Sequence, residues 1–478
     1  MNIDFALLVP EFLLVGLAFV LFAVDLFIPA RRKGILPYLA VAGLIAVMGS
    51  AFSLLGNEGD LYSGIYVVDK YAIFFKVFLP IVGAVMVLAS RDFVRKHLEN
   101  PGEFYSLIMV SVLGMMMMVS ANELLTAYIS LELLSFCLYV MAAYAKREAR
   151  SNEAGVKYIL IGAFSSGVLL YGMSLIYGSL GTTTFEGMAE VLRSGEHLEL
   201  AFLAGLTLLI AGFGFKVVAA PFHMWAPDVY EGAPTPVTAY LSVASKAASF
   251  ALLLRLFAVG FQPVIDDWKP IVAAIAALTM TVGNVVAISQ KNIKRLLAYS
   301  SIGHAGFLLV GIAALSEMAS TALVLYLVGY AATTFAAFIC VIIYFNLTGG
   351  EKIEEYAGLA KRSPVLALAL TVSLFSLAGL PFFAGFTIKF YIFTAAAKEG
   401  LLWLVAIAVV NSLISVYYYL MVIKQMYMKP APEGAKPLTM PRIAGGTLLA
   451  LVGVVFLIGI YPQSITGLIE KATPGLFG

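Results

Sequence analysis

Charged residues are scarce in this sequence, and hydrophobic residues take their place. Only 12% of the 478 residues are Asp, Glu, Lys or Arg, whereas 61% are hydrophobic and the mean hydropathy is +0.96. A soluble chain of this length would divide into domains with far more charge on their surfaces. The net charge of +2 is also too small to indicate a nucleic-acid partner. The composition therefore predicts an integral membrane protein.

Cysteine and the common cofactor motifs are almost absent. Cys137 and Cys340 lie in separate apolar runs, which argues against a disulfide framework or a metal site and favours small core residues. The sequence contains no GxxxxGK[ST], no dinucleotide fingerprint, no CxxC and no HExxH. We therefore expect no metal, nucleotide or redox cofactor on this chain. Energy for uphill transport would have to come from an ion gradient or a partner protein.

Apolar runs long enough to cross a bilayer recur along the whole chain. A transmembrane helix needs roughly 20 such residues. The first run follows Asp4 and Glu11 without a basic region or a cleavage site, so we expect a retained helix there. The candidate segments are 5–28, 36–55, 72–90, 104–120, 122–144, 154–178, 200–229, 235–261, 269–288, 294–314, 319–346, 364–396, 401–427 and 441–461. An all-α polytopic protein of about 14 helices follows from this pattern. Within the loop 178–199 we also expect a short amphipathic helix at the surface.

Lysine and arginine are distributed unequally between alternate connections. The odd-numbered connections and the segment ends beside them hold nineteen of them, whereas the even-numbered connections with their segment ends and the C-terminal tail hold five. Because cytoplasmic loops carry the excess of basic residues, the odd-numbered loops are predicted to be cytoplasmic. Both termini would then lie on the non-cytoplasmic side of the membrane.

The seventh and twelfth segments are long and are interrupted by proline. The interruptions lie around Pro221, in FKVVAAPFHMW, and around Pro381, in LAGLPFFAGFTIKF. Each is the fourth of five segments, which predicts two inverted five-helix repeats, helices 4–8 and 9–13, with an ion path near the breaks. The chain would then divide into 1–103, 104–261 and 262–428, followed by a linker and last helix at 429–478. A structural kink without transport is the alternative for either break.

Four ionisable residues lie too far from either surface for their charges to reach water. A rise of about 1.5 Å per residue places Lys246 and Glu132 near the middle of their segments. Lys216 precedes the first break, and Lys389 follows the second. A charge at this depth costs about 2.5–3.5 kcal/mol, so each is a candidate for ion transport. A structural ion pair is the alternative for each.

Other ionisable residues allow a simpler explanation. Lys76, Lys157 and Arg255 are close to helix ends, where a long side chain can extend to the surface. His304 is either a hydrogen-bonded core residue or a member of a proton relay, with Ser300 and Ser301 nearby. The proton affinity of a buried lysine depends strongly on whether a carboxylate lies beside it, which suits lysine to proton transfer.

Three stretches resemble the antiporter-like membrane subunits of respiratory complex I. They are PFHMWAPDVYEGAPTPVTAYLSVASK, QKNIKRLLAYSSIGHAGFLL and GLPFFAGFTIKFYIF, and the similarity extends over nearly the whole chain. The hairpin YEGAPTPVTAYLS is more similar to subunit N than to subunits L and M. Lys389 is also typical of subunit N, whereas a glutamate is expected there in subunit M.

The resemblance implies fourteen helices in two inverted repeats and a role for each candidate residue. Glu132 would pair with Lys216, Lys246 would link two half-channels, and Lys389 would serve the outer exit. Lys157 also matches a family lysine. The implied activity is proton translocation in a bacterial inner-membrane NADH:quinone oxidoreductase. NADH, flavin, iron–sulfur clusters and quinone would be bound by partner subunits, among them the other antiporter-like subunits.

Two other functions remain open from the sequence. The chain could belong to a multi-subunit cation/proton antiporter, which neighbouring antiporter genes without iron–sulfur proteins would favour. It could also be a structural membrane subunit without a proton path of its own. In that case replacing Glu132 and Lys216 would leave proton transport unchanged.

Overall fold

The computed structural model describes residues 4–195 and 199–476, and this part of the chain is built almost entirely of helices. Thirteen helical stretches within it are long and apolar enough to cross a membrane. The interrupted twelfth segment adds a fourteenth, although each of its halves is too short to be counted alone. The prediction of about 14 membrane helices is confirmed.

The helices follow one another in the order expected from the apolar runs. The helices of the N-terminal half are α1 (Val9–Phe27), α2 (Leu36–Phe52), α3 (Lys70–His97), α4 (Pro101–Ser120), α5 (Leu124–Ala142), α6 (Ala149–Leu180), α7 (Phe185–Ser194), α8 (Glu199–Lys216), α9 (Trp225–Gly232), α10 (Thr235–Tyr240) and α11 (Lys246–Arg255). Those of the C-terminal half are α12 (Ile265–Ala287), α13 (Ile293–Ala313), α14 (Glu317–Thr348), α15 (Leu359–Arg362), α16 (Pro364–Ala378), α17 (Ala384–Lys398), α18 (Leu402–Met428), α19 (Arg442–Ile460) and α20 (Gln463–Ala472). The short helix expected in the loop 178–199 is α7, which buries Phe185, Met188 and Leu192.

One short hairpin departs from the all-helical expectation. Strands β1 (Gly59–Leu61) and β2 (Tyr66–Val68) pair antiparallel, with Asp60 opposite Val67. The turn between them is held by the Asp60 carboxylate, which accepts a hydrogen bond from the Gly64 amide at 2.8 Å. The strands are too short to produce a recognisable alternating pattern in the sequence.

Both predicted breaks are present, and each divides a segment into two half-helices. Residues 217–224 separate α8 from α9, and Val218 there has a positive φ of 64°. The Ala220 amide, freed by the break, donates to Thr279 Oγ1 at 2.9 Å. Residues 379–383 separate α16 from α17, and Gly379 has a φ of 88°. Irregular backbone of this kind is tolerated inside a membrane only where protein or water surrounds it.

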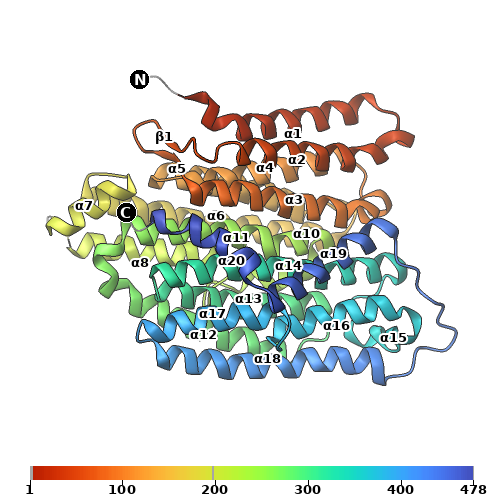
Figure 1. Cartoon of the computed structure of the whole chain (residues 1–478). Helices are drawn as coiled ribbons and strands as arrows, with labels where there is room; N and C mark the ends of the chain where they lie inside the picture. The colour runs from red at the N-terminus through yellow and green to blue at the C-terminus, as the bar shows by residue number, and fades with distance from the viewer. Residues whose placement is uncertain (1–3, 196–198, 477–478) are drawn as a thin grey trace.

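Figure 1 shows the long helices lying side by side, with α1 and α2 at one edge and α18 at the opposite edge. The C-terminal α19 and α20 return across the middle of this row, where both contact α14 and α3. Helices α13 and α14 and the stretch from Thr235 to Gly260 are the most deeply buried, whereas fewer than half of the residues of α1, α2, α18 and α19 are buried. Lys246, Ser301 and His304 lie in these most deeply buried stretches.

Candidate functional site

Glu132 on α5 and Lys216 at the end of α8 form a buried ion pair. Lys216 Nζ lies 3.0 Å from Glu132 Oε1, and the two side chains are 5% and 13% exposed. Lys216 also donates to Ser135 Oγ at 2.8 Å and to Ser166 Oγ at 3.3 Å. Ser166 in turn donates to Glu132 at 2.6 Å. The structure thus brings together two residues that are 84 positions apart in the chain.

The local structure explains why these positions meet. Glu132 and Ser135 are three residues apart on α5 and therefore share one face. Lys216 is the last residue of α8, where the free carbonyl groups of the helix end favour a positive charge. With one carboxylate and two hydroxyl groups around it, the ammonium group has a partner for each of its three N–H donors.

Among the residues that the structure describes, Lys246 contacts neutral groups only. It lies at the start of α11, directly after a π-helical turn from Leu241 to Ser245, and it is 1% exposed. Its ammonium group donates to both the carbonyl oxygen and the hydroxyl oxygen of Ser301 on α13. The Ser301 hydroxyl is 2.8 Å from the Tyr330 hydroxyl. Single π-helical turns inside α-helices are frequent at functional sites.

His304 continues the same face of α13. It lies one turn after Ser301, and its Nδ1 is 2.7 Å from the Tyr326 hydroxyl. Its ring centroid is 5.1 Å from that of Tyr330, the residue that also contacts Ser301. This geometry fits a hydrogen-bonded core residue, because the ring is buried and bonded to Tyr326. It equally fits a member of a proton relay, because the ring adjoins the contacts of Lys246.

Lys389 on α17 reaches back across the second break. Its Nζ donates to the carbonyl oxygens of Leu377 and Ala378, each at 3.1 Å, and to Ser412 Oγ at 2.9 Å. These carbonyl groups form the end of α16, so the ammonium group lies at the negative end of a half-helix. Gly379 makes room for this contact, since a Cβ there would lie 3.0 Å from Lys389 Cδ. The Phe307 ring, on the same α13 as His304, lies 4.8 Å from Nζ.

Lys157 lies apart from these buried groups. Its side chain is 42% exposed and forms ion pairs with Glu153 at 2.7 Å and Asp228 at 3.2 Å. Asp228 also pairs with Arg295 at 2.8 Å. The Asp228 carboxylate therefore accepts hydrogen bonds from both basic side chains. Of the three side chains expected to extend to the surface, only Lys157 does so.

The expectation for Lys76 and Arg255 is wrong, because both are buried in ion pairs. Lys76 Nζ lies 3.0 Å from Glu11 Oε1, with side-chain exposures of 0% and 7%. Arg255 contacts both carboxylate oxygens of Asp69 at 2.8 Å. Glu11 belongs to the first turn of α1, not to a segment before it, and Asp69 caps the start of α3. An acidic residue at the start of a helix was the available signal for both partners.

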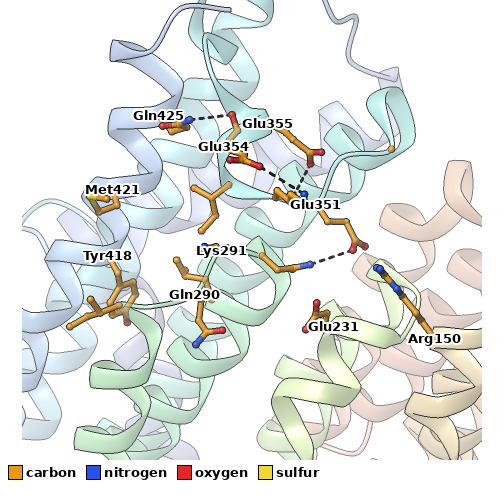
Figure 2. A pocket seen from close by; sticks show the side chains of 16 residues that line it. Arg150, Glu231, Gln290, Lys291, Glu351, Glu354, Glu355, Tyr418, Met421 and Gln425 are labelled. Carbon is orange, nitrogen blue, oxygen red and sulfur yellow. Dashed lines mark hydrogen bonds and ion pairs between the residues drawn. The ribbon is translucent and has the colours of Figure 1, made fainter. Parts of the chain in front are cut away.

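A pocket of about 770 Å³ opens at the end of the molecule where the basic odd-numbered loops lie. Figure 2 shows Arg150, Glu231, Lys291 and Glu351 around it, so its wall carries both signs of charge. Tyr418 of α18 also lines the pocket and donates to Asn284 Oδ1 at 3.0 Å.

Several hydroxyl groups lie beside this pocket-lining tyrosine. The ring centroids of Tyr418 and Tyr419 are 4.4 Å apart, and the Tyr419 hydroxyl is hydrogen-bonded to Ser300 Oγ. Ser300 is the neighbour of Ser301, which holds Lys246. The tyrosines were missed in the sequence, because a tyrosine in an apolar helix is indistinguishable from a packing residue until its neighbours are known.

Comparisons with known proteins agree with this arrangement. Residues 121–415 match the family described as NADH:quinone oxidoreductase/Mrp antiporter, transmembrane. A relative from Moorella thermoacetica, named NADH-quinone oxidoreductase subunit N, is 43% identical, with 96% of each chain covered. One of the same name from Trichlorobacter lovleyi is 45% identical over 90% of this chain and 89% of its own. A chain of respiratory complex I from Thermus thermophilus superimposes with a TM-score of 0.82, at 31% identity, with 97% of this chain and 99% of that chain covered.

Proposed function

Since the chain belongs to the NADH:quinone oxidoreductase/Mrp antiporter family and is a subunit N-type member of it, we propose that it translocates protons in the membrane arm of an NADH:quinone oxidoreductase. Electron transfer would occur on partner subunits, which would bind NADH, flavin, iron–sulfur clusters and quinone. Its membrane partners would include the other antiporter-like subunits. The buried Glu132–Lys216 pair is the observation that carries the proposal. Charged groups inside a membrane protein are costly in free energy, so we expect such a pair to have a function.

The buried groups would act in sequence. Lys216 would carry a proton while it exchanges Glu132 for its neutral partners Ser135 and Ser166. Lys246 would receive and pass on a proton between the two halves of the chain, since α11 contacts both α8 and α13. Ser301, His304 and Phe307 follow one another at intervals of three residues on α13. This face leads from Lys246 toward Lys389, which would release the proton.

The energy required is within the range of such an ion pair. Lifting one proton against about 150 mV costs roughly 3.5 kcal/mol. At about 1.36 kcal/mol per pKa unit, this corresponds to a swing of roughly 2.5 units in proton affinity. Forming and breaking a contact between an ammonium group and a carboxylate at 3.0 Å inside the protein can supply a change of this size.

Orientation and internal symmetry complete the proposal. The excess of basic residues supports an orientation in which the pocket of Figure 2 would face the cytoplasm and both termini would lie on the other side of a bacterial inner membrane. Residues 104–261 and 262–428 would be the inverted repeats, preceded by 1–103 and followed by 429–478. Single cysteines placed in the loops 31–33 and 429–442 test this orientation. Labelling of either loop by an impermeant thiol reagent from outside intact cells would contradict it.

Replacing the paired residues tests the function directly. Glu132→Gln and Lys216→Met are expected to lower the number of protons moved per electron in reconstituted complex. Removing one partner of a buried pair also costs about 3–5 kcal/mol in stability, so the amount of assembled complex must be measured in each variant. Parent-like proton movement in both variants, at parent-like assembly, would leave a structural subunit as the better description.

The antiporter alternative predicts a different activity. A subunit of a cation/proton antiporter would exchange protons for sodium or potassium without electron transfer. Purification of the intact complex distinguishes the two, because co-purifying iron–sulfur subunits favour the oxidoreductase. The full-length similarity to subunit N supports the oxidoreductase.

A further inference from the structure

A second buried group of polar residues lies among the N-terminal helices. It comprises Glu11 of α1, Tyr66 of β2, Lys76 of α3 and Ser120 of α4, and we call it the N-terminal cluster. All four residues are at most 5% exposed. Glu11 Oε1 accepts a hydrogen bond from the Tyr66 hydroxyl at 2.8 Å and lies 3.0 Å from Lys76 Nζ.

The N-terminal cluster leaves much of its hydrogen-bonding capacity unused. Glu11 Oε2 and Ser120 Oγ have no hydrogen-bond partner among the described residues, although Ser120 lies beside the Tyr66 phenol. Lys76 Nζ contacts Glu11 and the face of the Tyr66 ring, at 5.0 Å from its centroid. Lys216, by contrast, has a partner for each of its donors. Free buried polar atoms are where a proton or a bridging water can be accepted.

The chemistry of the N-terminal cluster repeats that of Glu132 and Lys216. Each site joins a carboxylate and an ammonium group at 3.0 Å, and in each a hydroxyl group, that of Tyr66 or of Ser166, donates to the same carboxylate oxygen. Stability alone does not account for such a pair, because apolar residues of similar volume are often as good or better in a buried position. A titratable function accounts for it.

The N-terminal cluster is also placed near one membrane surface and is linked to the inner helices. Lys76 is six residues into α3, or about 9 Å from its start, and Ser120 ends α4 at the same level. The other charged groups that face it are Asp69 and Arg255, which pair with each other. Arg255 ends α11, the helix that begins with Lys246. Tyr71 lies beside Arg255, and its hydroxyl group donates a hydrogen bond to the Ala251 carbonyl oxygen of the same helix.

We propose that the N-terminal cluster is a second proton-binding site, at which a transported proton resides on Glu11 before it leaves to the non-cytoplasmic side. The proposal rests on the proposed function, since the inner helices must deliver the proton. On arrival, the proton bonds to Glu11 Oε2 and neutralises the carboxylate, while Lys76 keeps its charge. Loss of that proton to outside water restores the Glu11–Lys76 pair, so no other reactant is needed.

Matched variants of the assembled complex test the proposal. Glu11→Gln removes the proton site, and Asp25→Asn is the control, because Asp25 pairs with Lys33 at 2.9 Å near the opposite end of the same helix. Glu132→Gln reports on the proposed function separately. We expect Glu11→Gln and Glu132→Gln each to lose proton movement per electron, while Asp25→Asn resembles the parent. Infrared difference spectra during turnover should also show a protonated carboxyl signal that is present in the parent and in Asp25→Asn and that disappears in Glu11→Gln.

Each other result is decisive. Parent-like proton movement in Glu11→Gln with a loss in Glu132→Gln would overturn the second site and leave the proposed function intact. Parent-like movement in both would overturn both. If Glu11→Gln does not assemble, Glu11→Gln/Lys76→Gln removes the stranded charge. Parent-like proton movement in that double variant would show the pair to be structural.

Discussion

Asp69 and Arg255, 186 residues apart in the chain, face each other with both carboxylate oxygens 2.8 Å from the guanidinium nitrogens. Asp69 also caps α3, accepting the Ala72 amide at 2.7 Å, and Arg255 Nε donates to the Val119 carbonyl at 3.1 Å. This one pair therefore ties the start of α3 and the end of α4 to α11. Parallel two-point contacts between arginine and a carboxylate are among the strongest ion pairs in proteins.

Asp69→Asn should destabilise the junction of these three helices. Arg255 is 3% exposed, so the substitution strands its charge inside the protein. The expected loss is about 3–5 kcal/mol of unfolding free energy, visible as a lower melting temperature of the purified complex or as less assembled complex. Glu58→Gln, directly before the neighbouring hairpin, is the control, because Glu58 is exposed. A change there should stay within about 0.5 kcal/mol. Equal stability of parent and Asp69→Asn would show that the pair contributes nothing.

The same pair predicts a dependence on pH. Burial alone would raise the pKa of Asp69, but the charge of Arg255 and its hydrogen bonds outweigh it, so the pKa lies below the usual value. The ionised form is thus favoured in the folded state, and its contribution is fully present above the unfolded pKa of about 3.9. It is lost as the pH falls through the lower folded pKa. The difference in melting temperature between parent and Asp69→Asn should therefore shrink on acidification below about pH 4. A difference that grows would contradict this sign.

The sequence predicted the helices and the breaks well, because both depend on local composition. Runs of about 20 apolar residues specify membrane helices, and Pro221 and Pro381 mark the two interruptions. The partners of the buried charges were harder to predict. Lys76 and Arg255 looked like surface lysine and arginine until the helices carrying Glu11 and Asp69 were placed beside them. Contacts over such sequence distances depend on which helices pack together, and periodicity does not contain that information.

Tyr419→Phe should slow proton delivery to Lys246 while leaving the fold intact. The substitution removes the hydroxyl that contacts Ser300, and so removes one of the hydroxyl groups near the pocket and next to Ser301, which holds Lys246. The stability cost should be about 1 kcal/mol, as for one lost hydrogen bond. Tyr144→Phe is the control, because it loses a comparable hydrogen bond, to the Asn100 carbonyl at 2.7 Å, away from these hydroxyl groups. Proton movement per electron, measured in vesicles, should fall in Tyr419→Phe only. An equal fall in both variants would indicate a loss of stability instead.

Lys389 contacts Phe307, the last of the α13 residues on the face that begins at Ser301. Substitutions at this position can separate the effect of its positive charge from the effect of its ability to carry a proton. Its partners are the Leu377 and Ala378 carbonyls and the Ser412 hydroxyl, and no carboxylate pairs with it among the described residues. Lys389→Met has a similar length but cannot titrate, so we expect it to lower proton movement per electron. Lys389→Glu should retain more, because a protonated carboxyl can donate to the Ala378 carbonyl and still release its proton. Assembly must be measured in both, since unfilled carbonyl groups at the end of α16 could reduce the protein level alone. If the Met variant moves protons as the parent does at equal assembly, Lys389 only caps the half-helix, and the proton must leave by another route.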